Sequence, residues 1–141
     1  MVEIKKILVP VDGSDHSMNA AAYAVELARM SGAEIFLTHC HKPFPAILGE
    51  PYYQKAVNKI MKESEQLLVP YRELFDNANV AYTERIMEGP PREAVPSVAR
   101  HEKCDLIILG SRGLSDLEGL FLGSVTHRVL RVAPCPVMVI R

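Results

Sequence analysis

Glycine and hydroxyl residues gather in the last third of the chain at a spacing that suits an anionic ligand. Residues 110–113 (Gly-Ser-Arg-Gly) are followed by nine residues and then by residues 123–126 (Gly-Ser-Val-Thr). Glycines let phosphate oxygens approach backbone amides, and a helix start adds N–H groups and a favourable dipole. The hydroxyls of Ser124 and Thr126 can donate hydrogen bonds, and Arg112 can hold a phosphate through two of them. The pattern predicts a phosphate cradle, to which His127 or Arg128 can add charge.

Each of these residues also has a purely structural explanation when it is taken alone. Gly110 can end a strand, Gly123 can precede a helix, and Ser124 can cap that helix. Asp12, which precedes Gly13 and Ser14, can form an Asx turn or contact a ligand. We favour the functional interpretation because the whole set falls where a ligand site is expected.

Periodicity places these residues at the ends of strands and the starts of helices. Apolar runs predict five strands, at residues 6–12, 34–40, 80–87, 105–109 and 137–140. Patterns with a spacing of three and four residues predict four helices, near residues 14–32, 52–76, 90–99 and 124–132. Pro70 is expected to kink or split the second helix, and residues 111–122 fit an ordered loop better than a helix.

Alternating strands and helices predict one fold class. We expect an α/β, open, doubly wound, Rossmann-like single domain over residues 1–141, in which a five-stranded parallel sheet carries helices on both faces. In such sheets a ligand binds beyond the carboxyl ends of the strands, where neighbouring crossovers leave to opposite sides. Residues 10–15, 38–43, 87–91 and 110–126 are therefore the segments where we expect the site.

Composition excludes several classes of partner. The 141 residues carry 16 Lys plus Arg and 17 Asp plus Glu, which lacks the basic excess of a dedicated nucleic-acid binder. The longest stretch without these residues, 16–25, is ten residues long, whereas a membrane span needs about 20 apolar residues. The N-terminus lacks the apolar region of a signal peptide. Three cysteines without a C-x-x-C pair indicate reduced thiols and a cytoplasmic protein.

Other motifs are weaker or missing. His39-Cys40-His41 places two imidazoles on one face of a strand, but no third ligand has a suggestive spacing, so we expect no protein-ligated metal. His16 and Ser17 near Asp12 lack the strained elbow of a hydrolase nucleophile. Neither G-x-x-x-x-G-K-(S/T) nor G-x-G-x-x-G occurs, which weakens phosphate-loop NTPase and dinucleotide oxidoreductase interpretations.

Taken together, these segments resemble the universal stress proteins over essentially the whole chain. The resemblance rests on residues 6–14 (KILVPVDGS), on residues 105–113, and on the stretch from Gly123 through Val137. The spacing G-x2-G-x9-G-(S/T) marks the ATP-binding branch of that family, and this chain matches it in full. The resemblance implies an adenine nucleotide alpha hydrolase-like variant of the Rossmann-like fold, a nucleotide-binding member and, commonly, a homodimer formed through the last strand. That strand is short, apolar and expected at the edge of the sheet.

The resemblance also implies a role for each matching residue. Asp12 would lie near adenine and ribose beside a wall of Pro10 and Val11, and Cys40 would replace the usual small aliphatic residue against the base. The remaining positions would complete the pocket and hold the triphosphate: Leu109, Gly110, Arg112, Gly113, Gly123, Ser124, Val125 and Thr126. Magnesium or manganese is implied through the phosphates.

Three functions follow from these features. The first is an ATP-binding regulatory protein of the stress response. The second is a slow ATP hydrolase or phosphoryl-transfer enzyme, for which the candidate groups lack a recognisable catalytic spacing: Arg112, Asp116, Glu118 and His127. The third is a nucleotide-independent interaction or chaperone-like protein in which the glycines are architectural. The intact motif favours the first.

Overall fold

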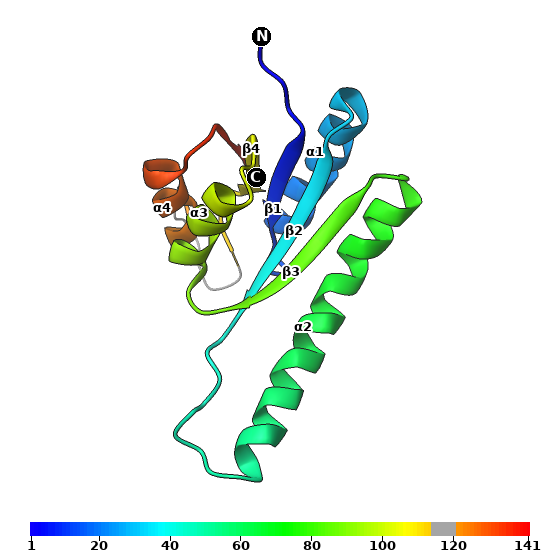
Figure 1. Cartoon of the computed structure of the whole chain (residues 1–141). Coiled ribbons are helices and arrows are strands. Elements are labelled where there is room, and N and C mark those ends of the chain that lie inside the picture. The colour runs from blue at the N-terminus through cyan, green and yellow to red at the C-terminus, as the bar shows by residue number, and fades with distance from the viewer. Residues whose placement is uncertain (114–120) are drawn as a thin grey trace.

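The chain folds as an α/β protein in which strands and helices alternate from one end to the other (Figure 1). The computed structural model describes residues 1–113 and 121–141. The strands are β1 (Lys6–Pro10), β2 (Glu34–His41), β3 (Tyr82–Glu88), β4 (Leu106–Gly110) and β5 (Val137–Ile140). The helices are α1 (Asp15–Ser31), α2 (Tyr52–Asn77), α3 (Pro91–His101) and α4 (Ser124–Val132).

The five strands form one parallel sheet in the order β3-β2-β1-β4-β5. From β1 the chain moves outward through β2 to β3, then returns across the sheet to β4 and β5. The crossovers therefore leave to opposite sides at β1 and β4, which makes their carboxyl ends the topological switch point. The Rossmann-like arrangement expected from the sequence is confirmed.

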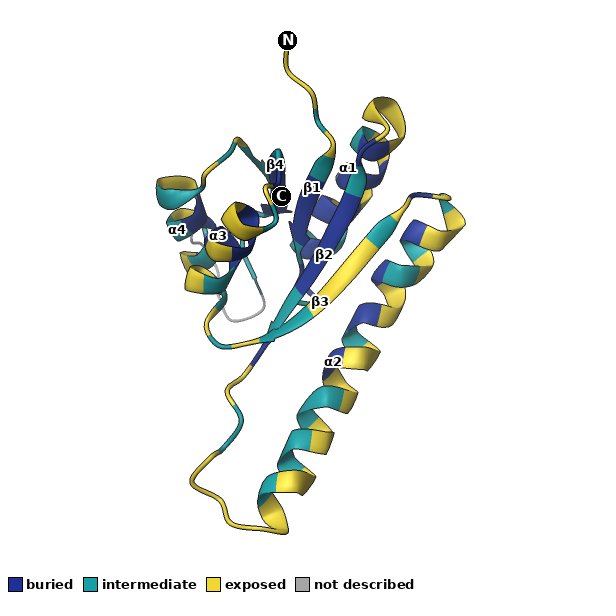
Figure 2. Cartoon of the chain, viewed as in Figure 1, coloured by how far each residue is buried: buried dark blue, intermediate teal, exposed yellow. Residues whose placement is uncertain are grey.

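The sheet separates two hydrophobic cores because successive side chains of a strand point to opposite faces. Ile7 and Val9 of β1 pack with α1 and α2, and Leu8 between them packs with α3 and α4. Figure 2 shows the buried residues concentrated along β1, β2 and the facing sides of the helices. A strand buried on both faces needs apolar residues at every position, which is why β1 appears in the sequence as a continuous apolar run.

The boundaries of α1 follow from its capping residues. The hydroxyl of Ser14 accepts a hydrogen bond from the backbone N–H of Ser17 at 3.1 Å, which satisfies a donor that the first turn leaves open. The helix ends at Gly32, whose φ of 75° is the left-handed conformation that favours glycine. Both ends lie where the sequence predicts them.

The expected division of α2 at Pro70 does not occur, because the helix runs unbroken from Tyr52 to Asn77. Proline removes one intrahelical hydrogen bond, which leaves the carbonyl of Gln66 without its usual donor. Both residues lie on the exposed side of the helix, where water can solvate that carbonyl. The expectation of a split was therefore wrong for a physical reason that depends on which face the proline occupies.

Two further comparisons concern the ends of the elements. β1 stops at Pro10 rather than at Asp12, although the N–H of Val11 still donates to the carbonyl of Thr38 at 2.8 Å. Most of the loop expected at residues 111–122 lies outside the described residues.

None of the helices in the described ranges is long and apolar enough to cross a membrane.

Tyr71 connects the outer helix α2 to the turn that follows β1. Its ring is 1% exposed, and its hydroxyl lies 2.8 Å from the hydroxyl of Ser17. The same oxygen accepts a hydrogen bond from the backbone N–H of Gly13 at 3.1 Å. One buried phenol thus holds both the turn at residues 12–14 and the first turn of α1.

Replacing Tyr71 by phenylalanine is expected to destabilise the protein by about 1–3 kcal/mol, because the N–H of Gly13 and the hydroxyl of Ser17 lose a buried partner. Urea denaturation followed by circular dichroism measures this loss. Tyr23→Phe is the matched control, since Tyr23 is 56% exposed on α1. Equal midpoints for the two variants would contradict the anchoring role.

Candidate functional site

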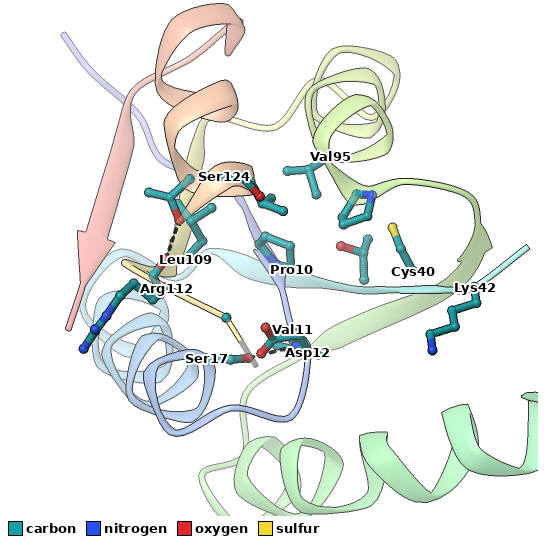
Figure 3. A pocket seen from close by; sticks show the side chains of 16 residues that line it. Pro10, Val11, Asp12, Ser17, Cys40, Lys42, Val95, Leu109, Arg112 and Ser124 are labelled. Atoms are coloured by element: carbon teal, nitrogen blue, oxygen red, sulfur yellow. Dashed lines mark hydrogen bonds between the residues drawn. The ribbon is translucent and has the colours of Figure 1, made fainter. Parts of the chain in front are cut away.

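A cavity of about 320 Å³ opens at the switch point, beyond the carboxyl ends of β1, β2 and β4 (Figure 3). The first residues of α3 and α4 form its opposite wall, so two helix N-termini border one space. The residues that line it are Pro10, Val11, Asp12, Ser17, Thr38, Cys40, Lys42, Pro91, Val95, Leu109, Gly110, Arg112, Gly113, Ser124, Val125 and Thr126.

The structure brings together all of the sequence-predicted site residues except Gly123. That residue is buried and precedes α4, where its N–H donates to the carbonyl of Ser111 at 2.7 Å. Its carbonyl accepts from the N–H of His127 at 3.0 Å. Gly123 is therefore not part of the cavity lining, and its backbone hydrogen bonds fix the position where α4 begins.

Sequence analysis missed five residues of the lining, which come from α1, β2, α3 and the segment after β2: Ser17, Thr38, Lys42, Pro91 and Val95. Thr38, Lys42 and Pro91 belong to segments in which a site was expected, but nothing in the spacing distinguishes them. The one available signal was Thr38 itself, a threonine in the middle of an apolar strand. Burying a hydroxyl costs free energy unless it has a hydrogen-bond partner, so such a residue is a candidate for ligand contact.

Asp12 forms the Asx turn that the sequence offered as its structural role, and it also lies in the cavity wall. Its Oδ1 accepts from the N–H of Ser14 at 2.9 Å, which is an Asx turn, and its own N–H donates to the hydroxyl of Ser17 at 3.2 Å. The same side chain lines the cavity and is the one carboxylate among the lining residues that the structure describes. The turn thus orients a negative group toward the space where a ligand would lie.

Gly110 is required by close packing, in addition to its place in the cavity wall. A Cβ atom added there would lie 2.8 Å from both the carbonyl carbon and the Cβ of His16 in α1. Separations this short do not occur for real side chains, so any larger residue would push α1 away from β4. The architectural explanation holds for this glycine, because α1 crosses the sheet directly over it.

Thr126 uses its hydroxyl inside the protein. The Oγ1 atom donates to the carbonyl of Gly110 at 2.7 Å, and the residue is 3% exposed. The sequence predicted that this hydroxyl donates to a ligand, and that prediction is wrong. The hydroxyl instead donates to β4 and connects the start of α4 to the end of that strand. Ser124, two residues earlier, is exposed at the start of the helix.

His16 links α1 to the segment after β4. Its Nδ1 lies 3.0 Å from the hydroxyl of Ser111, and its Nε2 lies 3.4 Å from the guanidinium of Arg112. Because a guanidinium only donates hydrogen bonds, Nε2 acts as the acceptor and Nδ1 carries the proton. The side chain of His16 thus contacts both Ser111 and Arg112, and Arg112 lines the cavity.

The electrostatics of the lining favour an anion. Among the described residues of the lining, Arg112 and Lys42 supply two cationic side chains and Asp12 supplies the single anionic one. The N-termini of α3 and α4 add the positive ends of two helix dipoles, with backbone N–H groups that have no partner inside the helix. Pro10, Val95 and Cys40 contribute apolar side chains to the same cavity, with Lys42 beside Cys40 (Figure 3). A ligand with an apolar part and a negatively charged part suits such a lining.

Cys40 is a protonated thiol in this environment. Burial raises the pKa of its sulfhydryl to about 11, because the thiolate is poorly solvated in an apolar wall. At neutral pH it behaves as a small hydrophobic side chain that can pack on a flat group.

The described residues contain no group of three His, Cys, Asp or Glu side chains that could hold a metal ion. His39 and His41, the pair noted in the sequence, instead lie against backbone carbonyls through their Nδ1 atoms, 2.9 Å from Val11 and 2.6 Å from Lys42. Two of the candidate catalytic carboxylates, Asp116 and Glu118, lie outside the described residues.

The fold and the cavity define a class: a Rossmann-like α/β protein with a cavity at its switch point. The model of the universal stress protein family matches residues 3–141, and the chain therefore belongs to that family. A universal stress protein of Thermus aquaticus, from the QAH/OAS sulfhydrylase 3′ region, is 38% identical over 138 residues, which are 97% of this chain and 98% of that relative.

Two solved structures extend the comparison. The universal stress protein UspA from Lactobacillus plantarum has a TM-score of 0.86 and 25% identity, covering 100% of both chains. A universal stress protein solved in complex with cAMP has a TM-score of 0.72 and 26% identity, covering 99% of this chain and 98% of its own. The family and fold expected from the sequence are thus confirmed.

Replacing Gly110 by alanine is expected to lower the free energy of unfolding by roughly 1–3 kcal/mol, because the new Cβ would overlap the main chain of His16. Guanidinium denaturation measures the effect. Gly49→Ala serves as the control, since a Cβ at Gly49 meets nothing within 4 Å. If Gly110→Ala were as stable as Gly49→Ala, the packing role of Gly110 would be refuted.

Alkylation of Cys40 by iodoacetamide is expected to accelerate about tenfold for each pH unit through about pH 9.5, because only the thiolate reacts. A free thiol such as glutathione levels off earlier, since its pKa lies near the ordinary value of about 8.5. Peptide mass spectrometry separates Cys40 from the other two cysteines. A plateau for Cys40 near pH 9 would contradict the raised pKa.

Proposed function

We propose that this protein binds ATP in the switch-point cavity and acts as a nucleotide-dependent regulator of a stress response. The observation that carries the proposal is the meeting of the glycine motif, the N-termini of α3 and α4, and two cationic side chains around one cavity. Membership of the universal stress protein family supports it, as does the relative of 26% identity that was solved with cAMP, an adenine nucleotide.

The two ends of the cavity match the two ends of a nucleotide. In the proposed arrangement the base packs against Pro10, Cys40 and Val95, and Asp12 accepts a hydrogen bond from the nucleoside. The phosphates lie at Gly113 and Ser124, where backbone N–H groups of the first turn of α4 point outward. Leu109 and Gly110 form the floor between these ends, and Arg112 adds charge.

A divalent ion would be held mainly by the ligand. Magnesium prefers an octahedral set of oxygens and is commonly bound through one or two carboxylates together with substrate phosphates. Within residues 1–113 and 121–141 the cavity offers one carboxylate, Asp12, so magnesium or manganese would be held chiefly by phosphate oxygens and water. Such an ion would neutralise phosphate charge.

Binding, rather than rapid turnover, is the activity we assign. Efficient phosphoryl transfer needs a positioned base or water-orienting residue at the terminal phosphate. In the described part of the lining the one carboxylate, Asp12, already accepts from Ser14, and Thr126 donates to Gly110. Any hydrolysis is therefore expected to be slow.

The three cysteines are unpaired, which accords with the reducing cytoplasm that we propose as the location of this protein.

Native mass spectrometry of freshly purified protein, followed by acid extraction, tests the assignment directly. We expect about one ATP for each chain. Recovery of ADP or AMP would shift weight to a hydrolase, and a turnover assay would then measure its rate. Protein that is empty and also fails to bind added ATP with magnesium or manganese would overturn the proposal in favour of a nucleotide-independent interaction protein.

Gly113→Val is expected to weaken ATP binding at least about tenfold, because the side chain occupies space that a phosphate needs next to the backbone. Isothermal titration calorimetry gives the affinity, and circular dichroism verifies folding. Gly49→Val is the matched control, since Gly49 lies outside the cavity and has open space around it. A folded Gly113→Val protein that binds ATP with wild-type affinity would refute the assignment of Gly113 to the phosphate cradle.

We also propose that two chains pair through β5. This strand ends the sheet and bonds to β4 on one side, and its residues 137–140 are all partly exposed. The carbonyls of Pro136 and Ile140 face β4, because they accept from Ile107 and Ser111. Since successive backbone groups alternate, the N–H of Val139 points to the open edge, where a second copy can pair.

Val139→Pro is expected to convert the dimer to a monomer while the fold is retained, because proline removes an outward donor and no bond to β4. Light scattering coupled to gel filtration reports the mass. A wild-type chain that is monomeric at all concentrations, or a variant that remains dimeric, would exclude pairing through this edge.

A further inference from the structure

Thr38 carries a buried hydroxyl that the described part of the chain leaves without a hydrogen-bond partner. The residue is 1% exposed, and its Oγ1 is one of two such side-chain atoms within residues 1–113 and 121–141. Burying a hydroxyl in this way costs free energy that an apolar residue of the same shape would not. A hydroxyl kept at that cost points to a partner that the described residues do not supply, and a ligand in the cavity is such a partner.

The backbone fixes this hydroxyl in the cavity. Thr38 lies in β2 opposite Pro10 of β1, and its carbonyl accepts from the N–H of Val11. Cys40, two residues further along the strand, has its side chain on the same face, and both residues line the cavity. Thr38 is therefore a polar residue in the wall of the site, with its hydroxyl buried just behind the surface that Pro10, Cys40 and Val95 also line.

Its distance from the phosphate cradle identifies which part of a ligand can reach it. β2 and β4 are separated by β1, so Thr38 is about 10 Å from the end of β4, which is two strand spacings. The cradle at Gly113 and Ser124 follows β4 and opens α4. A nucleotide with its phosphates in that cradle presents its base, rather than its sugar or phosphates, to Thr38.

We propose that the hydroxyl of Thr38 hydrogen-bonds to the edge of the purine base and makes this part of the cavity selective for it. The inference rests on the nucleotide-binding function proposed above. A hydroxyl both donates and accepts, and a purine edge offers ring nitrogens as acceptors and an exocyclic amine as donor. The weak S–H group of Cys40 packs against the base and adds little polar recognition.

The proposal predicts that Thr38→Val has opposite effects on the stability of the free protein and on its affinity for ligand. Thr38→Val removes the buried hydroxyl and keeps the branched shape, so the free protein is expected to melt at the same temperature as wild type or higher. The same change is expected to weaken the binding of ATP and of adenosine equally, by roughly 2- to 12-fold in affinity, which is the range for one neutral hydrogen bond. A residue that only supported the fold would lose stability and affinity together.

Calorimetric titration of the full chain with ATP and with adenosine, and competition by inorganic tripolyphosphate, tests this. Thr38→Ser, which keeps the hydroxyl, is expected to stay within about twofold of wild type for ATP. Thr83→Val is the matched control, because Thr83 is exposed on β3 and lies outside the cavity lining. Tripolyphosphate has no base, so its affinity is expected to be the same for wild type and Thr38→Val.

The outcomes separate the two proposals. Unchanged ATP and adenosine affinities in Thr38→Val, with wild type binding normally, would overturn the role of Thr38 and leave the nucleotide site standing. An equal loss of tripolyphosphate affinity would also overturn it, because the effect would then not involve the base. A wild-type protein that binds none of these ligands would refute the proposed function, and the role of Thr38 with it.

Discussion

The contact between Gly110 and the main chain of His16 sets the geometry on which the site depends. A hydrogen atom in place of a side chain lets α1 cross directly over the end of β4. Once α1 is there, His16 reaches Ser111 and Arg112, which orients the segment after β4. Thr126 bonds to the carbonyl of the same glycine and brings the start of α4 to this point. One residue without a side chain is thus contacted by α1 and α4.

The cavity results from how the sheet is wound rather than from any single motif. Because the chain turns outward from β1 in one direction and from β4 in the other, the crossovers leave a space where these two strands end. The helices that return on the α3 and α4 side present their N-termini to that space. The apolar part of its lining comes from strand residues such as Pro10 and Cys40, and the polar part comes from turns and helix starts. Separate physical causes therefore produce the two parts of one lining.

Much of this architecture was predictable from the sequence, because parallel strands buried on both faces are continuous apolar runs and helices carry their own capping residues. Ser14 and Gly32 mark the ends of α1 by local chemistry alone. What could not be predicted depends on tertiary contacts. The packing role of Gly110 requires knowing that α1 passes over it, and the uninterrupted α2 requires knowing that Pro70 faces water. Thr38 was visible as a hydroxyl in an apolar strand, but only the fold shows that the described residues offer this hydroxyl no partner.

The buried residues of α2 are unevenly distributed along its length. Ser64, Leu68, Tyr71 and Phe75 all belong to the later part of the helix, and Figure 2 shows exposed and half-buried residues along the earlier part. Opening the first turns would expose little apolar surface, so it costs far less free energy than global unfolding. Amide hydrogens near Tyr52 should therefore exchange with solvent through local opening, and those around Tyr71 only when the whole domain opens. A single helix would then belong to two cooperative units of different stability.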